Sequence, residues 1–117
     1  MIKIKVFEDY KNKEYIIDIS GHAGYAEKGK DIVCAGVSTL FYTFLNYCEE
    51  ACEHNTLCKL EKAITDNKCV LQLRDEAMLE GQALRVIVKG FKMLAETYPE
   101  YVALSYINYY PGHKTSP

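Results

Sequence analysis

Residues 21–38 have the sequence GHAGYAEKGKDIVCAGVS. This stretch follows an alternating, strand-like run and leads into an apolar run at 33–52 whose spacing predicts a helix. It carries one histidine, His22, at the end of the strand and one cysteine, Cys34, at the start of the helix. Glycines and charged residues without apolar periodicity predict a loop at 21–31. The junction therefore predicts both the local order of elements, strand, loop and helix, and the two candidate reactive side chains.

Two strands are predicted before the junction. Apolar and polar residues alternate over 1–7, which is typical of a half-buried strand. A polar turn is expected at 8–13. Tyr15, Ile17 and Ile19 then form the inward face of a second strand. The spacing therefore predicts an antiparallel hairpin.

The apolar run after the junction predicts a long helix with a defined start. Asp31 is expected to be its N-cap, because its side chain can accept hydrogen bonds from amides two or three residues later. One stripe at helical spacing is expected to face the core: Val33, Val37, Leu40, Phe41, Phe44, Cys48 and Cys52.

The second half of the chain repeats this order of elements. Strands are predicted at 58–64 and 69–73, with a turn at 65–68 between them. A second helix is expected to open at Asp75 or Glu76 and to end before Pro99.

A last strand at 101–107 completes the order ββαββαβ. This is an α+β fold with one mixed or antiparallel sheet and two helices packed on one of its faces. The domain is expected to cover 1–108, and residues 109–117 are expected to form a flexible C-terminal tail.

Composition narrows the function classes. The chain has 117 residues, 49% hydrophobic and 26% charged, which suits one globular domain. Its net charge of −2 argues against nucleic acid as a partner. No signal peptide or membrane span is recognisable, so the expected location is the cytoplasm, with no membrane partner. All five cysteines are therefore expected to be reduced thiols.

Cys34 and His22 are the candidate catalytic pair. A thiol at a helix N-terminus is helped toward the thiolate by the helix dipole, and nearby helix amides are candidates for an oxyanion hole. His22 is a candidate general base and acid that protonates the leaving amine. The alternative is that Cys34 is a small core residue and His22 a surface or capping residue. Spacing alone does not decide between them.

Two further residues are expected near this pair. Asp31 is either a plain helix cap or a cap that also balances charge at the site. Ser38 lies one helical turn after Cys34, where it either hydrogen-bonds near the thiol or bonds back to the helix backbone.

The same residues carry a resemblance to a known family. The matching segments are Gly21-His22-Ala23, the run Gly29-Lys30-Asp31-Ile32-Val33-Cys34-Ala35-Gly36-Val37-Ser38, and Tyr98-Pro99-Glu100-Tyr101. They resemble the Prp family of bacterial cysteine proteases that process a ribosomal protein. The resemblance covers nearly the whole chain and stops before the tail.

The resemblance implies roles and partners. Cys34 would be the nucleophile, His22 the general base and acid, and Asp31 and Ser38 supporting residues. The substrate would be the N-terminal extension of large-subunit ribosomal protein twenty-seven, and the enzyme a homodimer. Relatives in phages process capsid or scaffold proteins. A mobile gating loop is also implied between the two catalytic residues, formed by Gly24, Tyr25, Ala26, Glu27, Lys28, Gly29 and Lys30.

The residues alone leave two alternatives open, a zinc site and a different function. Cys48, Cys52, His54 and Cys58 lie within eleven residues and have the side chains of a zinc site, but the cysteines also fit buried core positions. No metal and no cofactor is expected. The alternative functions are a phage-type protease and a non-catalytic binding module associated with the ribosome.

Overall fold

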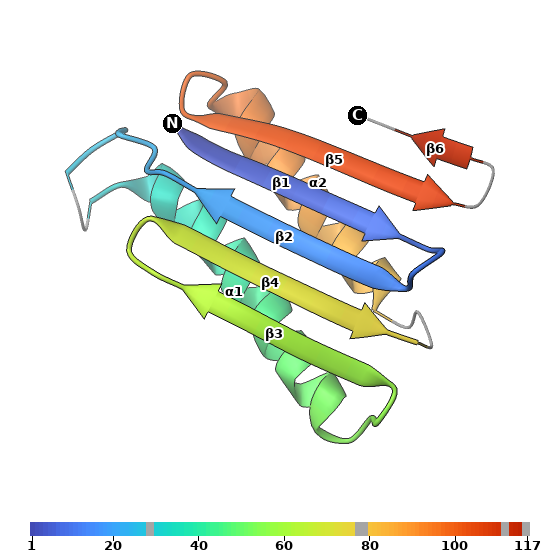
Figure 1. Ribbon diagram of the computed structural model, residues 1–117. Helices are drawn as coiled ribbons and strands as arrows, with labels where there is room; N and C mark the ends of the chain where they lie inside the picture. The colour runs from blue at the N-terminus through green and yellow to red at the C-terminus, as the bar shows by residue number, and fades with distance from the viewer. Residues whose placement is uncertain (28–29, 77–79, 111–112, 116–117) are drawn as a thin grey trace.

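The computed structural model describes residues 1–27, 30–76, 80–110 and 113–115, with side chains up to Asn108. The elements in chain order are β1 Ile2–Asp9, β2 Glu14–Ser20, α1 Ile32–Glu53, β3 Cys58–Ile64, β4 Lys68–Asp75, α2 Gly81–Thr97, β5 Val102–Tyr110 and β6 His113–Thr115 (Figure 1). The predicted order ββαββαβ is confirmed, with β6 added after it.

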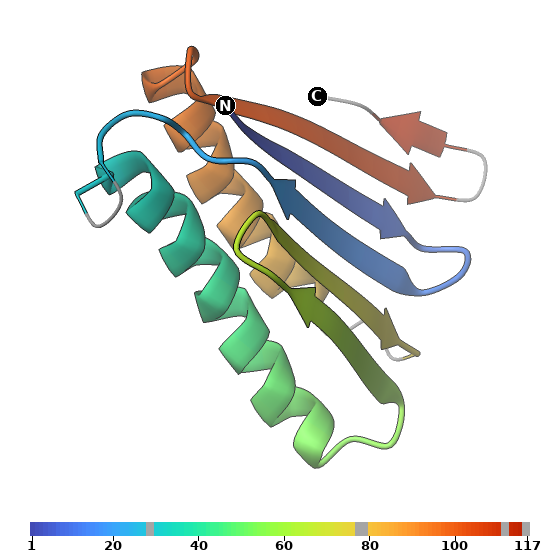
Figure 2. The ribbon, with the colours of Figure 1, turned by 60° about the vertical axis from the view of Figure 1, so that its left-hand side comes forward.

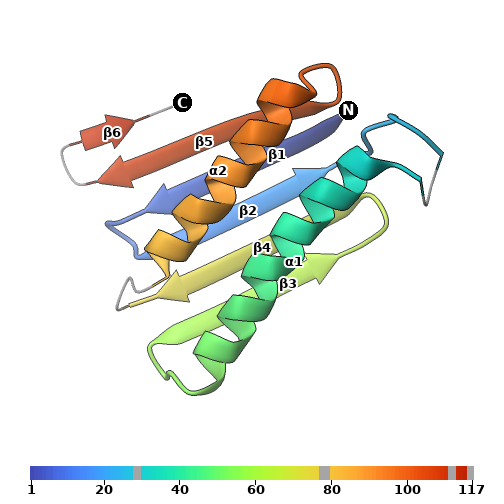
Figure 3. The same cartoon turned by 180° about the vertical axis from the view of Figure 1, so that it is seen from behind.

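The strands form one mixed sheet in the order β3-β4-β2-β1-β5-β6. β1 and β5 are parallel, and the other neighbouring pairs are antiparallel. Figure 3 shows both helices crossing the same face of the sheet, as predicted. This layering is expected because each helix has a single apolar stripe that must be buried.

The core lies between that face and the two helices. Tyr15, Ile17 and Ile19 of β2 are buried, which confirms the predicted inward face. The helix stripes opposite them include Val37 and Phe41 of α1. Burying each such side chain stabilises the fold by about 1.5–3 kcal/mol. This packing fixes the position of the N-terminal end of α1 over the end of β2.

Buried carboxyl groups explain two of the boundaries that were predicted wrongly, the end of β1 and the start of α2. β1 continues through Glu8 and Asp9, because the buried Glu8 accepts a hydrogen bond from the Tyr106 hydroxyl at 2.5 Å. α2 begins at Gly81, because Asp75 ends β4 as a buried residue whose carboxylate accepts the Glu80 amide at 3.0 Å. An acidic residue whose carboxylate is hydrogen-bonded inside the fold is predicted from the sequence as part of a turn or as a helix cap, because its partner is not visible there.

The C-terminal segment contains more strand than predicted. β5 continues to Tyr110, whereas the predicted strand ended at Ile107, and β6 pairs with it antiparallel. The flexibility of 109–117 stays a prediction.

The expectation that all five cysteines are reduced is wrong. Cys52 at the end of α1 and Cys58 at the start of β3 form a disulfide, with their Cα atoms 5.0 Å apart. A short turn, in which the Cys58 amide bonds to the Asn55 carbonyl, brings them together. Cys34, Cys48 and Cys69 are free thiols, and Cys48 is fully buried.

The disulfide bears on the zinc alternative. Two of its four candidate ligands, Cys52 and Cys58, are bonded to each other. Within the described ranges, no three His, Cys, Asp or Glu side chains are grouped so that they could hold a metal ion. None of the helices in those ranges is long and apolar enough to cross a membrane.

Candidate active site

The predicted site residues line one cavity of about 710 Å³. It lies at the end of the molecule where β2 ends, α1 begins and the turn between β3 and β4 approaches them (Figures 1 and 2). His22, Asp31, Cys34 and Ser38 all line it. The structure thus brings together the four residues that the sequence singled out.

Asp31 is the N-cap of α1, as predicted. Its backbone is extended, with φ −82° and ψ 100°, and its Oδ1 accepts the amides of Val33 at 3.0 Å and Cys34 at 2.9 Å. The Ala35 amide donates to the Asp31 carbonyl at 3.0 Å. The helix amides near Cys34 were the candidates for an oxyanion hole; here those of Val33 and Cys34 are bonded to the cap side chain, and that of Ala35 makes the first bond of the helix.

The Cys34 thiol is partly buried, and its Sγ accepts the Ala23 amide at 3.4 Å. Burial raises the pKa of Cys34, the Ala23 hydrogen bond lowers it, and the negative charge of the nearby Asp31 carboxylate raises it further, so the net shift is upward. The surroundings of the thiol therefore disfavour the thiolate, whereas the start of the helix alone was expected to favour it.

His22 follows β2 and is exposed to the cavity. Its Nε2 lies 2.6 Å from Oδ1 of Asn67, in the turn between β3 and β4. Among the described side chains, this is the hydrogen bond of the imidazole, and none joins it to Cys34. The ring and the thiol share the cavity without being bonded to each other.

The predicted gating loop is held against the body at two points. Oδ2 of Asp31 accepts the amides of Tyr25 at 3.1 Å and Ala26 at 3.4 Å. The Tyr25 ring packs edge-on against Tyr98 and Tyr101, with centroids 5.6 Å and 5.2 Å away. Both anchors connect the loop to segments that carry the family resemblance.

The other loop residues are placed as follows. Gly24 and Ala26 line the cavity, and the Lys30 amide closes a turn onto the Glu27 carbonyl at 2.9 Å. Lys28 and Gly29 lie outside the described residues.

Asp66 and Asn67 also line the cavity, although the sequence predicts them only as part of the turn at 65–68. Their position depends on the pairing of β2 with β4, in which Ser20 lies opposite Lys68. Once that pairing is known, the turn before Lys68 must lie beside the residues that follow Ser20.

Comparison with known proteins gives consistent results. The family described as cysteine protease Prp matches residues 1–103. The chain is 32% identical over 113 residues to the ribosomal processing cysteine protease Prp of Mycoplasma genitalium, which covers 93% of this chain and 99% of that protein. It is 31% identical over 103 residues to the protein of that name from Mycoplasma pneumoniae, covering 88% of this chain and 92% of the other.

Solved structures share the fold. One is an essential ribosomal processing protease Prp from S. aureus, in complex with a covalently linked product peptide. It superposes with a TM-score of 0.70 at 24% identity, covering 91% of this chain and 99% of that one. SMU.848 from Streptococcus mutans superposes with a TM-score of 0.64 at 25% identity, covering 93% and 96%.

Proposed function

The chain belongs to the cysteine protease Prp family, and from this premise we propose that Cys34 and His22 carry out its peptide-bond hydrolysis. The observation that supports this most directly is that both side chains line one cavity while coming from separate elements. Cys69, also a free thiol, is outside that lining, and Cys48 is fully buried. Cys34 is thus the free thiol best placed to meet a peptide.

The first chemical step is acylation. His22 takes the proton from the Cys34 thiol, and Sγ attacks the scissile carbonyl carbon to form a tetrahedral intermediate. The C–N bond then breaks, and His22 returns the proton to the leaving amine. This step requires the imidazole to approach Sγ more closely than it does here, as is common before substrate binds.

Deacylation completes the cycle. Water attacks the thioester carbonyl while His22 removes one of its protons, and the S–C bond breaks to release the new carboxylic acid, which loses its proton to solvent. The proton on His22 returns to Sγ, which restores the thiol. Protein atoms and protons therefore balance over one turnover without a metal or cofactor.

The proposed substrate is the N-terminal extension of large-subunit ribosomal protein twenty-seven. The support is the family and the two curated relatives, each described as a ribosomal processing protease. A phage-type capsid or scaffold substrate is the alternative, since it would use the same chemistry. The non-catalytic binding module is disfavoured by membership of a protease family.

The segment 24–30 is proposed to gate the site. Its described part is held by two hydrogen bonds from backbone amides to Asp31 and by two ring contacts of Tyr25. Opening the segment therefore requires only these few contacts to break. A closed gate keeps the thiol from bystander peptides and holds it beside Asp31. Homodimerisation and a cytoplasmic location complete the proposal, and a sedimentation measurement of mass tests the former.

The test is cleavage of a synthetic peptide that spans the ribosomal extension, read by mass spectrometry. The unaltered protein should cut it at one bond, Cys34→Ala should give no product, and His22→Ala should be nearly as inactive. Cys69→Ala is the matched control, because it removes a free thiol outside the cavity lining and should keep activity. Product from Cys34→Ala would overturn the assignment. If the protein cut a capsid peptide and not the ribosomal peptide, the phage-type substrate would replace the ribosomal one.

A further inference from the structure

We propose that Asn67 is a positioning residue that orients His22 for catalysis, so that the pair works as part of a Cys-His-Asn arrangement. The observation is the 2.6 Å contact between Asn67 Oδ1 and His22 Nε2, across 45 residues of sequence. The inference rests on the proposed role of His22 and adds a third group to it.

The backbone brings the two residues together. β2 and β4 pair antiparallel, with Ser20 opposite Lys68 as the last pair of the ladder. One residue beyond that pair, the Gly21 amide donates to the Asn67 carbonyl at 2.9 Å. Gly21 has φ 86°, which turns the chain so that His22 follows alongside the Asn67 side chain. The contact is thus a continuation of the sheet register.

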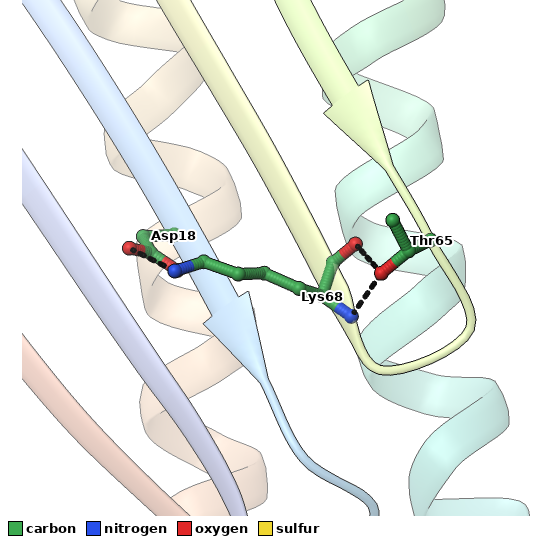
Figure 4. A network of polar contacts seen from close by, with 3 residues as sticks. All are labelled: Asp18, Thr65 and Lys68. Atoms are coloured by element: carbon green, nitrogen blue, oxygen red, sulfur yellow. Dashed lines mark hydrogen bonds and ion pairs between the residues drawn. The ribbon is translucent and has the colours of Figure 1, made fainter.

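The turn that carries Asn67 is held at both of its ends (Figure 4). The Thr65 amide donates to the Lys68 carbonyl at 2.7 Å, and the Lys68 amide donates to the Thr65 hydroxyl at 3.1 Å. The Lys68 ammonium pairs with Asp18 of β2 at 3.7 Å, which ties the turn to the strand that ends at the site. A group held by its own backbone in this way is preorganised to orient another.

The chemistry of the contact assigns the protons of the imidazole. A carboxamide oxygen only accepts hydrogen bonds, so the nitrogen bonded to it must be the donor. A neutral imidazole carries one N–H, which leaves Nδ1 of His22 with a lone pair. Nδ1 is therefore the atom that takes the Cys34 proton. The same division of roles recurs in Cys-His-Asn proteases of unrelated fold.

The contact contributes to orientation more than to folding. Both side chains are exposed, and a hydrogen bond in contact with water contributes little to the stability of a fold. Removing the carboxamide should therefore leave the protein folded. The loss should appear in the protonation pattern of the ring and in the chemical steps.

The experiment reads the tautomer directly, using ¹⁵N-labelled full-length chain at a pH where His22 is neutral. Long-range ¹H–¹⁵N spectra, with the His22 signals assigned from a His22→Gln variant, should show the Nε2–H form in the unaltered protein. Asn67→Ala should give a mixture of both forms. Asn67→Asp, which keeps an acceptor oxygen, should restore Nε2–H.

Peptide cleavage supplies the second readout. Asn67→Ala should lower kcat about 10- to 100-fold, because a misoriented base costs that much, while KM changes little. Asn67→Asp should recover much of the loss. Thr65→Val is the control, since it weakens the turn without removing the carboxamide, and should lower thermal stability but keep the Nε2–H form.

The two proposals fail in different ways. An Nδ1–H ring in the unaltered protein, or unchanged tautomer and kcat in Asn67→Ala, overturns the role of Asn67 and leaves the Cys34–His22 pair standing. The same tautomer change in Thr65→Val as in Asn67→Ala also overturns it, because the turn and not the carboxamide would be responsible. Cleavage that survives Cys34→Ala overturns the proposed function, while the spectra still report on Asn67.

Discussion

The carboxylate of Asp31 caps the backbone of Cys34 and also acts on its thiol. Oδ1 accepts the Cys34 amide at 2.9 Å. A negative charge beside a thiol disfavours the thiolate, so Asp31 adds to the rise in the pKa of Cys34 that burial begins. The residue that starts the helix thus also disfavours ionisation of the thiol.

Asp31→Asn should therefore lower the pKa of Cys34 relative to the unaltered protein. Asparagine is as good an N-cap as aspartate, so the start of α1 should persist. The measurement is the rate of iodoacetamide labelling of Cys34 against pH, resolved by peptide mass spectrometry. The midpoint should move to lower pH, which separates this effect from a change in access that alters only the plateau.

Asp66→Asn is the matched control for that experiment. It also removes a carboxylate from the cavity lining, while the charge that raises the pKa of Cys34 is that of Asp31. Its midpoint should stay close to that of the unaltered protein. An unchanged midpoint in Asp31→Asn would show that the Asp31 charge does not raise the pKa of Cys34.

Tyr25→Ala should loosen the gating loop. The variant removes two edge-on ring contacts, to Tyr98 and Tyr101, each worth about 0.5–1.5 kcal/mol. Amide hydrogen exchange at 23–27 should become about 5- to 100-fold faster. Tyr42→Ala is the control, because Tyr42 is 41% exposed, close to the 43% of Tyr25, but lies on α1. Equal exchange rates at 23–27 in both variants would show that the ring contacts of Tyr25 do not hold this loop.

Gly21→Ala should destabilise the fold and reduce cleavage together. Gly21 has φ 86°, and a Cβ there would collide with the carbonyl oxygen of Met1. The strain should cost about 1–3 kcal/mol in urea unfolding and displace His22. Gly24→Ala is the control, since it also has a positive φ, of 70°, but its Cβ would meet open space. A smaller loss in Gly21→Ala than in Gly24→Ala would contradict this account.

Glu8 should make stability fall as pH rises. Burial raises the pKa of Glu8 above its ordinary 4.5, against the opposing effects of Tyr106 and Arg85. Its contribution is fully present below the unfolded pKa and is lost as pH rises through the higher folded pKa. The unfolding free energy of the unaltered protein, minus that of Glu8→Gln, should therefore decrease as pH rises above the ordinary pKa of 4.5.

Asp9 provides a comparison of opposite sign. Burial acts to raise its pKa, but hydrogen bonds from Asn12 and Lys11 outweigh burial and lower it. Its stabilising contribution is present above the unfolded pKa and lost as pH falls. The difference between the unaltered protein and Asp9→Asn should thus increase as pH rises toward the ordinary pKa of 3.8, whereas that for Glu8→Gln decreases above 4.5. Parallel curves would show that neither carboxyl group governs the pH response.

The sequence predicted the elements that depend on local pattern. Alternation located β2, and helical spacing with a capping aspartate located α1 and its start at Asp31. Two reactive residues at the ends of one loop were then enough to locate His22 and Cys34 in one site. These predictions succeed because each uses neighbours within about a dozen residues.

The remaining features depend on long-range contacts that the sequence does not display. Asn67 reaches His22 only through the pairing of β2 with β4, and a turn sequence gives no sign of its neighbour. The raised pKa of Cys34 results first from burial and then from the nearby Asp31 carboxylate, whereas helix position alone predicts a lowered pKa. Glu8 is predicted as part of a turn because its hydrogen-bond partner, Tyr106, is 98 residues away in the sequence.

The two oxygens of Asp31 have separate partners, so the loop can be released without releasing the helix. If segment 24–30 opens as proposed, Oδ2 is freed from Tyr25 and Ala26 while Oδ1 keeps the helix capped, so the helix need not unwind. The exposed contacts that would break are worth about 2–3 kcal/mol together, which would leave the open form at about 1% of molecules. A peptide that binds only that form would show an apparent affinity about 100-fold weaker than its contacts provide.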